Sequence, residues 1–510
     1  MELIWSTVLT VWGWLLDHLL YINLAFSIII IFFQRRDPRS VWTWLLALYF
    51  IPVFGIVFYL LFGQDMKKSR MFRVKEVSDR LNLPVKSQED IIRSDDMPEE
   101  MMDPMSRDFK SLIIYNLETS GSVLTVNNQV QIYTDGQAKF EALRNALRQA
   151  RRFIHIQYYI IKNDELFDSI VPILLDKVRE GVEVRILCDG MGGRFMPKKR
   201  WDQMRRAGIK VGVFFPPFLG WLNLRVNYRN HRKIVVVDGA AGFVGGFNIG
   251  REYISRDPKF GYWRDTHLEI KGEAAISLQI RFALDWNYVT GENLFKEIRY
   301  FGEEAEYARR RLNGRIHAVW PDPEHVSEMV CMQIITSGPD TREPHIRNNY
   351  LELFHKAKHH IYIQTPYFIP DDAIFSSLKI AALSGVDVRL MIPCKPDHPF
   401  VYWATCSYAG ELLDYGARVY VYENGFLHSK GIMVDGRVSC YGTANMDIRS
   451  FELNFEVNAT IYDEDVTGQL EEAFMNDLPH CREITREEYG DRNLWMRIKE
   501  QSSRLLSPLL

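Results

Sequence analysis

The second half of this chain repeats the pattern of the first, and no other feature constrains its fold as strongly. The strand-like segments FIHIQYYII, around Gln157, and IYIQTPYFI, around Gln364, each follow a stretch with the apolar spacing of an amphipathic helix. The segment GVEVRILCD from Gly181 is likewise matched by GVDVRLMIP from Gly385. Amphipathic helices that alternate with short β-branched strands are typical of layered α/β domains. We therefore predict an α/β domain that occurs twice.

Each half also carries the motif His-x-Lys-x4-Asp, followed by a turn of small residues and an Asn. The first copy, HRKIVVVDGAAGFVGGFN, supplies His231, Lys233, Asp238 and Asn248. The second copy, HSKGIMVDGRVSCYGTAN, supplies His428, Lys430, Asp435 and Asn445. Each residue lies 197 positions from its counterpart (428 − 231, 445 − 248). One such match could arise by chance among 13 histidines, but two with a common offset indicate one duplicated site.

The residue types in the motif are suited to phosphoryl chemistry. Side chains at i and i+2 of an extended strand point the same way, so each histidine projects together with its lysine. An imidazole can attack phosphorus or carry a proton near neutral pH, and a lysine can stabilise the charge that develops on the phosphoryl oxygens. We expect Asn248 and Asn445 to donate hydrogen bonds to the same oxygens. Asp238 and Asp435 each precede a glycine, and a role in holding a turn is favoured over direct catalysis.

Composition narrows the class of protein. The net charge of −3 and the pI near 6.5 give no basic footprint, which argues against a nucleic-acid partner. The six cysteines have no CxxC spacing, so neither a zinc site nor a disulfide framework is expected. No metal-ligand cluster and no P-loop pattern is evident, and the sequence predicts no metal and no cofactor.

Two apolar runs open the chain, at about 15–33 and 41–62. Each approaches the roughly 20 residues that cross a bilayer. We therefore predict a transmembrane hairpin over residues 1–66 and a multi-pass protein of the cell membrane. The basic residues that follow the second run favour a cytoplasmic catalytic body.

The rest of the chain divides into three predicted segments: a polar linker at 67–115, a first α/β domain at 116–318 and a second at 319–510. An insertion in the first half, FFPPFLGWLNLRVNYRN, has no equal in the second. It is either an apolar lip that enters the membrane or an ordinary packed loop. The apolar C-terminal RLLSPLL contacts either the bilayer or another protomer, so a homo-oligomer is possible.

The paired motifs resemble those of the phospholipase D superfamily, and the hairpin with its duplicated body is similar to bacterial cardiolipin synthases over essentially the whole chain. The resemblance implies an α/β fold of two α-β-α domains related by a pseudo-twofold axis, with both histidines in one cleft. It makes His231 the nucleophile and His428 the general acid and then base. It also implies a carboxylate that orients each histidine. Counted from the histidine of the same half, Asp265 lies 34 residues on and Glu456 lies 28 residues on.

The resemblance further implies the substrates. Two molecules of phosphatidylglycerol would give cardiolipin and glycerol through a phosphohistidine, without a nucleotide. A phospholipase D with water as acceptor, a phosphatidylserine synthase with serine, and a phosphodiester nuclease use the same motifs. An inactive membrane scaffold is the alternative from another class, although the intact His, Lys and Asn of both halves argue against it.

Overall fold

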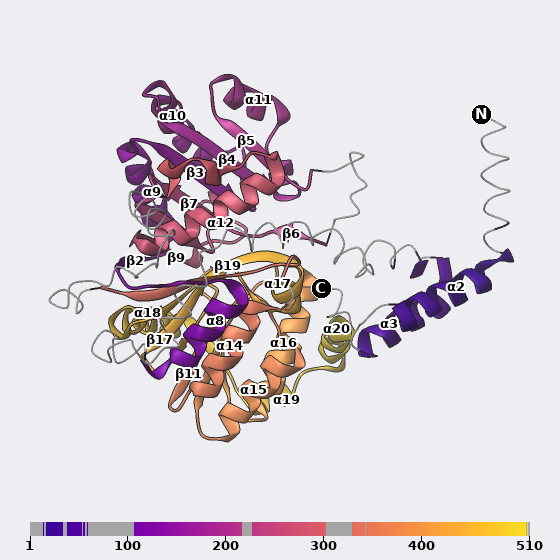
Figure 1. Cartoon of the computed structure of the whole chain (residues 1–510). Coiled ribbons are helices and arrows are strands. Elements are labelled where there is room, and N and C mark those ends of the chain that lie inside the picture. The colour runs from indigo at the N-terminus through magenta and orange to yellow at the C-terminus, as the bar shows by residue number, and fades with distance from the viewer. Residues whose placement is uncertain are drawn as a thin grey trace.

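The computed structural model shows two α/β halves, one above the other, with an arm of two N-terminal helices beside them (Figure 1). Apart from a few single positions, it describes residues 17–33, 38–53, 107–216, 227–301, 329–341 and 343–505. The predicted linker therefore lies mostly outside the described residues, and so does most of the first-half insertion.

The first half is a mixed sheet with strand order β9-β8-β7-β3-β4-β5, in which β3, β4 and β5 run parallel and β2 adds to β9. Its strands are β2 Asn128–Asp135, β3 Phe153–Tyr158, β4 Glu183–Asp189, β5 Lys210–Phe214, β7 Ile234–Val237, β8 Ala241–Gly245 and β9 Trp263–Gly272. Its helices are α9 Gly136–Gln149, α10 Glu165–Arg179, α11 Lys198–Arg206 and α12 Glu273–Thr290.

The second half repeats this architecture with strand order β10-β19-β17-β16-β11-β13-β14-β20. Its strands are β10 Cys331–Ser337, β11 His360–Gln364, β13 Asp387–Pro393, β14 Arg418–Tyr422, β16 Gly431–Val434, β17 Val438–Gly442, β19 Asn454–Tyr462 and β20 Cys481–Ile484. Its helices are α14 His345–Lys356, α15 Asp372–Leu383, α16 Pro399–Leu413, α17 Ile448–Glu452, α18 Glu464–Asp477, α19 Arg486–Gly490 and α20 Leu494–Leu505, and a short ribbon pairs β12 Phe368–Ile369 with β18 Met446–Asp447. The α/β fold with a repeated domain is confirmed.

Local sequence explains where many of these helices begin. Asp135, Asp164, Asp371 and Asp463 precede α9, α10, α15 and α18, and each carboxylate accepts a backbone N–H of the first turn. Such a cap satisfies donors that have no partner inside the helix and places negative charge at the positive end of its dipole. The same device thus sets the start of helices in both halves.

Each sheet receives a short strand from the opposite half. The strand β6, Arg229–Asn230, pairs in parallel with Asn454–Phe455 of β19, and β15, Phe426–Leu427, pairs in parallel with Trp263–Arg264 of β9. Both guest strands directly precede a motif histidine. The exchange continues one residue further, because His231 N donates to Phe455 O at 2.9 Å and His428 N donates to Arg264 O at 2.7 Å.

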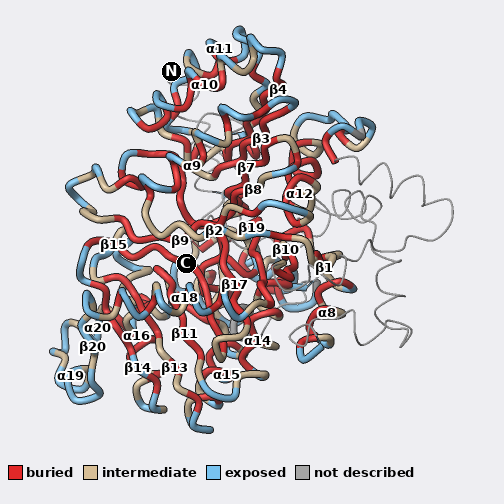
Figure 2. Tube along the Cα trace, turned by 90° about the vertical axis from the view of Figure 1, so that its left-hand side faces the viewer, coloured by how far each residue is buried: buried red, intermediate tan, exposed pale blue. Residues whose placement is uncertain are grey.

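One apolar core joins the halves. Phe282 and Trp286 of α12 belong to the same buried cluster as Met332 and Val457 of the second sheet. In Figure 2 the buried chain accordingly runs without a break from one half into the other. Burial of large apolar side chains on both sides favours a fixed relative position of the two sheets.

The predicted start of the first domain at residue 116 differs from the structure. Helix α8, Lys110–Ser120, and strand β1, Leu124–Thr125, pack on the second half, where β1 pairs with β10. Asn116 also donates to Gln333 Oε1 at 3.1 Å and to Asn349 Oδ1 at 3.0 Å. The reason is the apolar side of α8, which is buried in the core of the second half. The predicted boundary at 318 lies outside the described residues.

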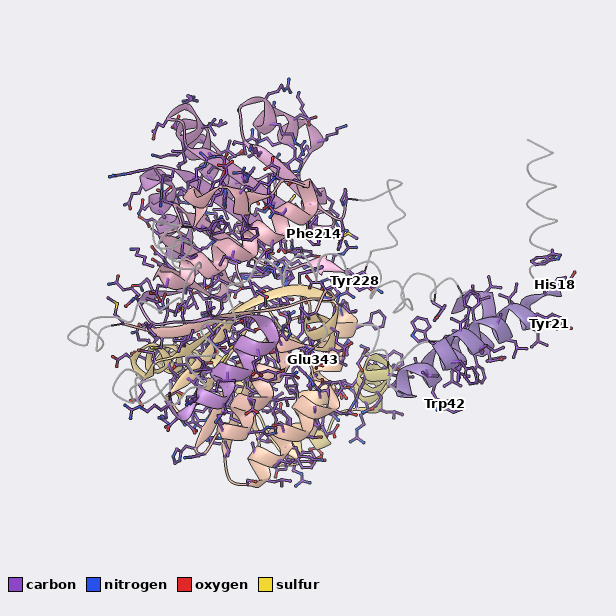
Figure 3. The ribbon with its side chains drawn as sticks, viewed as in Figure 1. His18, Tyr21, Trp42, Phe214, Tyr228 and Glu343 are labelled. Atoms are coloured by element: carbon purple, nitrogen blue, oxygen red, sulfur yellow. The ribbon has the colours of Figure 1, made fainter. Side chains whose placement is uncertain are left out.

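The N-terminal arm contains α2, Leu19–Ile28, which continues as a π-helical turn over Ile29–Phe33, and α3, Pro38–Phe50. The two helices contact each other, and Asn23 donates to Leu48 O at 2.8 Å. His18, Tyr21 and Trp42 lie along this arm, away from the α/β body (Figure 3). Among the described residues, no helix combines the length and the apolar character that crossing a membrane requires.

Candidate active site

The strand exchange brings each motif histidine to a carboxylate of the opposite half. His231 Nδ1 lies 2.9 and 3.0 Å from the two carboxylate oxygens of Glu456. His428 Nδ1 lies 2.7 Å from Asp265 Oδ2. Both carboxylates are completely buried. The site therefore contains two histidine–carboxylate pairs, and each pair is made from both halves.

This crossed arrangement corrects the pairing within each half that the resemblance implied. The carboxylates were counted from the histidine of their own half, whereas the structure pairs His231 with Glu456 and His428 with Asp265. The physical reason is the register of the guest strands, because β6 ends beside the residue before Glu456 and β15 ends beside the residue before Asp265.

A carboxylate can only accept a hydrogen bond, so each pairing places the imidazole proton on Nδ1 and leaves Nε2 for chemistry. Glu456 is held in turn by Thr443 Oγ1, which donates at 2.5 Å. At the matching position of the first half stands Gly246, where a Cβ would come within 1.9 Å of Asp265 Oδ1. The shorter carboxylate thus occupies space that a side chain would fill, and glycine is required there.

The two lysines lie directly beside the histidines. Lys233 Nζ donates to His231 O at 2.7 Å, and Lys430 Nζ lies 2.7 Å from His428 Nδ1 and 4.0 Å from Asp265 Oδ2. Burial lowers the pKa of Lys233 to about 7 and that of Lys430 to about 8. A bound phosphodiester anion would favour the charged form of both lysines.

The electrostatic couplings show that these groups form one site. Burial lowers the pKa of Lys233, and the charges of Glu456, Lys430 and Asp265 act on it as well. Burial likewise lowers the pKa of His231, which also feels Lys430 of the other half. The imidazole of His231 is therefore poised to be neutral in the empty site, with its Nε2 lone pair available to attack phosphorus.

The predicted phosphate-binding asparagines are tied into the protein. Asn248 Nδ2 donates to Tyr253 OH at 3.1 Å, and its Oδ1 accepts from Ile160 N at 3.1 Å. Contact of Asn248 with a phosphate would have to use its second amide hydrogen. Asn445 is buried, and no hydrogen bond within the described part of the chain reaches its Oδ1.

The motif aspartates hold turns. Asp238 and Asp435 adopt left-handed backbone conformations, with φ of 55° and 56°. The carboxylate of Asp238 accepts three backbone N–H groups, from residues 151–153, at 2.7–2.8 Å. That of Asp435 accepts the three from residues 358–360 at the same distances. Each aspartate thereby fixes the entry to the strand beside its histidine strand.

Sequence reasoning missed the buried arginine that supports Glu456, the carboxylate beside His231. Arg232, the middle residue of the first motif, is completely buried and makes two hydrogen bonds to Asp285, at 2.8 and 2.7 Å. Its Nε donates to Glu456 O at 3.1 Å, so this guanidinium holds the backbone of the residue that orients His231. The sequence offered one clue to this network, because this glutamine occurs in both repeats, as Gln157 and Gln364. Gln157 also donates to Asp285, at 2.8 Å.

Asp265, the carboxylate beside His428, has a matching support. Arg264 donates to Asp477 at 2.9–3.0 Å and to the backbone oxygen of Asp265 at 2.7 Å. Gln364, the counterpart of Gln157, donates to Asp477 at 2.8 Å. Both arginines, Arg232 and Arg264, belong to the first half. The supports of the two histidine–carboxylate pairs therefore do not follow the repeat at this position.

Aromatic rings complete the walls of the site. The ring of Tyr159 lies 5.1 Å from that of His231, and the ring of Trp263 lies 5.0 Å from that of His428. Phe214 and Tyr228, which belong to the first-half insertion on either side of residues 217–226, lie at the level where the halves meet (Figure 3) and form one buried cluster with Phe455. In the described ranges, no three or more His, Cys, Asp or Glu side chains are grouped to hold a metal ion.

Comparison with known proteins agrees with this geometry. Residues 143–266 and 350–478 match the family described as "Cardiolipin synthase, PLD-like domain", and residues 22–64 match "Phospholipase_D-nuclease N-terminal". The chain is 45% identical over 506 residues to the major cardiolipin synthase ClsA of Bacillus subtilis, covering 97% of this chain and 99% of that protein. It is 44% identical to the cardiolipin synthase of Oceanobacillus iheyensis, covering 96% and 97%.

Among solved structures, the phosphatidylserine synthase of Haemophilus influenzae shares the fold, with a TM-score of 0.57 at 16% identity over 80% of this chain and 97% of that one. That likeness concerns the fold alone. Identity of 44% and 45% over almost the whole length shows the family as well as the fold. The chain belongs to the bacterial cardiolipin synthases of the phospholipase D superfamily.

Proposed function

We propose that this protein joins two molecules of phosphatidylglycerol into cardiolipin and glycerol by transphosphatidylation. The observation that carries the proposal is the pair of buried histidine–carboxylate contacts, each shared between the halves and each beside a lysine. Two imidazoles with free Nε2 atoms and two ammonium groups are what a phosphohistidine mechanism needs.

In the first step, Nε2 of His231 attacks phosphorus of one phosphatidylglycerol. A P–N bond forms, the bond from phosphorus to the glycerol oxygen breaks, and His428 gives that oxygen a proton. Lys233 and Lys430 stabilise the charge that develops on the phosphoryl oxygens.

In the second step, His428 takes a proton from a hydroxyl of a second phosphatidylglycerol. The hydroxyl oxygen attacks phosphorus, the P–N bond breaks, and His231 returns to its neutral form. Asp265 favours the protonated His428 that exists before the first step and again after the second, and Glu456 favours the positively charged ring of the phosphorylated His231 that exists between the two steps.

We also propose that the body sits at a membrane. The two N-terminal helices support this, and so does α20, whose apolar face is turned outward. Its exposed large residues are Leu494, Trp495, Ile498 and Leu505, which lie on one side of the helix, whereas the buried Glu500 and Ser503 lie on the other. A helix packed only against protein would place its apolar side inward, and an outward apolar side suits an interfacial helix.

The membrane proposal can be tested with Trp495→Phe, which keeps the apolar face. The difference in fluorescence between the native protein and the variant is the signal of Trp495. In vesicles of equal parts phosphatidylglycerol and phosphatidylcholine with brominated acyl chains, this signal should be quenched. Quenching of that signal by aqueous iodide instead would place Trp495 in water and contradict the proposal.

The catalytic proposal is tested by incubating the purified full chain with phosphatidylglycerol alone. Cardiolipin and glycerol in equal amounts are the expected products, and His231→Ala should form neither. Phosphatidic acid as the main product would mean that water is the acceptor. Product formation only after addition of serine would instead identify a phosphatidylserine synthase.

A further inference from the structure

The two guest strands differ at one matched position beside the site. Arg229 in β6 corresponds to Phe426 in β15, at the same offset of 197 that relates the motifs (426 − 229). Each residue lies two positions before its histidine, so in an extended segment its side chain lies on the same side as the imidazole. The ring of Phe426 accordingly lies 6.0 Å from that of His428. The first half therefore places a cation where the second places an aromatic ring.

The guanidinium of Arg229 is buried, and within the described part of the chain neither of its terminal nitrogens makes a hydrogen bond. The residue is only 4% exposed. The nearest carboxylate, Asp189, lies 3.8 Å away. Its oxygens instead accept from Asn230 N at 2.9 Å and Met191 N at 2.8 Å. Asp189 thus balances the charge of Arg229 only from a distance and leaves its terminal N–H groups unsatisfied, and an anionic ligand would accept their hydrogen bonds.

A second guanidinium reaches the same place from the other half. Arg449 Nη2 donates to Asn227 O at 3.2 Å, two residues before Arg229. Burial lowers the pKa of Arg449, the charge of Asp447 opposes this effect, and the positive charge of Arg229 adds to it. Burial raises the pKa of Tyr159, and the charges of both arginines oppose this rise. Tyr159 is the residue whose ring contacts His231. Two guanidinium groups thus lie near the nucleophile, with the carboxylates of Asp189 and Asp447 also close to them.

We propose that Arg229 and Arg449 bind the phosphodiester of the acceptor phosphatidylglycerol, while the two motif lysines bind that of the donor. This inference rests on the proposed function. The acceptor carries its own anionic phosphodiester three carbons away from the terminal hydroxyl that attacks the phosphohistidine. Charge-assisted hydrogen bonds from a guanidinium fit such a group.

The subsite would also explain acceptor choice. Water and free glycerol present a hydroxyl but no phosphodiester, so neither can use the binding energy that these arginines offer. An acceptor anchored by its phosphate is held with its hydroxyl near phosphorus, which favours lipid over solvent.

Arg229→Gln tests the proposal through two reactions of the full-length enzyme. Exchange of labelled glycerol into phosphatidylglycerol forms the same phosphohistidine but needs no second phosphate, whereas cardiolipin formation needs both. The variant should retain glycerol exchange within about twofold and lose cardiolipin formation by roughly ten-fold or more, the effect of removing a charged hydrogen-bond donor. Arg229→Lys should recover part of the loss. Arg251→Gln, at an exposed arginine of the same half, is the matched control.

Equal loss of both reactions in Arg229→Gln would overturn the subsite, because Arg229 would then serve the donor or the fold. Unchanged cardiolipin formation would overturn it as well. Thermal unfolding separates a fold defect: Asp189 keeps two backbone N–H donors in the variant, so the transition temperature should change little, and a large fall would mean that Arg229 serves the fold. If the native enzyme catalysed neither reaction, the proposed function itself would fail, an outcome distinct from either of these.

Discussion

The two halves share a motif at a constant offset, yet they surround their histidines differently. Arg229 and Arg449 lie near Tyr159, which contacts His231, whereas Trp263 and Phe426 surround His428 with aromatic rings. Burial lowers the pKa of His428 to about 4. The duplication therefore supplies two similar arrangements of histidine, lysine and carboxylate, and the surrounding residues differ: two arginines lie near Tyr159 beside His231, whereas aromatic rings lie beside His428.

The crossed carboxylates also show why neither half is a catalytic unit alone. Each half provides a histidine without its orienting carboxylate and a carboxylate without its histidine. Removal of one half would leave the other with a histidine that has no orienting carboxylate. Assembly of the halves and assembly of the site are thus the same event.

The largest expected difference between the halves concerns the histidines themselves. With phosphatidylglycerol, we expect His231→Ala and His428→Ala each to lose roughly 10³-fold or more in turnover. With a phosphatidyl ester of p-nitrophenol, whose leaving group needs no proton, His428→Ala should still release p-nitrophenol in a burst, while His231→Ala should not. Release of p-nitrophenol measured by absorbance distinguishes the two. A burst from His231→Ala alone would exchange the assigned roles.

The carboxylates sharpen the same comparison. Because the pairs are crossed, Asp265→Asn should resemble His428→Ala, and Glu456→Gln should resemble His231→Ala, with losses of roughly 10²-fold in turnover. The p-nitrophenol ester should therefore rescue the first-half variant and not the second-half variant. If the p-nitrophenol ester rescued Glu456→Gln and left Asp265→Asn impaired, each carboxylate would act on the histidine of its own half.

The fold and the motif residues could be predicted because they depend on local patterns. Alternating apolar residues predict the strands, and two matched motifs predict one site. The crossed pairs could not be predicted, because His231 and Glu456 are 225 positions apart and meet only through the register of a two-residue guest strand. Helix α8 was missed for a similar reason, since its partner sheet lies more than 200 positions further on.

The buried arginines illustrate another limit. Arg232 occupies a variable place in the motif, and its partner Asp285 comes from a helix that the motif does not include. The importance of Arg229 depends on its burial and on terminal nitrogens that make no hydrogen bond within the described part of the chain, and no sequence pattern records either property.

The lysines offer an effect of intermediate size. Since burial lowers the pKa of Lys233 to about 7 and that of Lys430 to about 8, both lose positive charge as the pH rises through this range. We expect kcat/KM for phosphatidylglycerol to fall about ten-fold per pH unit above the first of these values, because the cationic form binds phosphate. Arginine keeps its charge, so Lys233→Arg should move the fall from near pH 7 towards pH 8.

The exposed Lys271, exchanged for arginine, provides the control for that pH profile. If Lys233→Arg kept the native profile while retaining activity, the alkaline limb would belong to another group. If only Lys430→Arg shifted the alkaline limb, Lys430 would have the lower pKa of the two lysines.

The smallest expected difference concerns the motif aspartates, whose environments are the most alike. Each carboxylate accepts three backbone N–H groups from a residue with positive φ. Asp238→Ala and Asp435→Ala should each lower the free energy of unfolding by about 2–3 kcal/mol, because three donors lose their acceptor and alanine disfavours that backbone conformation. Chemical denaturation measures this loss, and asparagine, which tolerates positive φ, should reduce it.

Turnover at a temperature well below the unfolding transition should stay within about twofold of native in both variants, as for substitutions outside a reactive centre. The comparison is sharp because a turn residue and a proton carrier differ in which property they change. A hundred-fold loss of turnover in one variant, with its stability preserved, would place that aspartate in the chemistry and make the two halves unlike even at the position where their contacts match most closely.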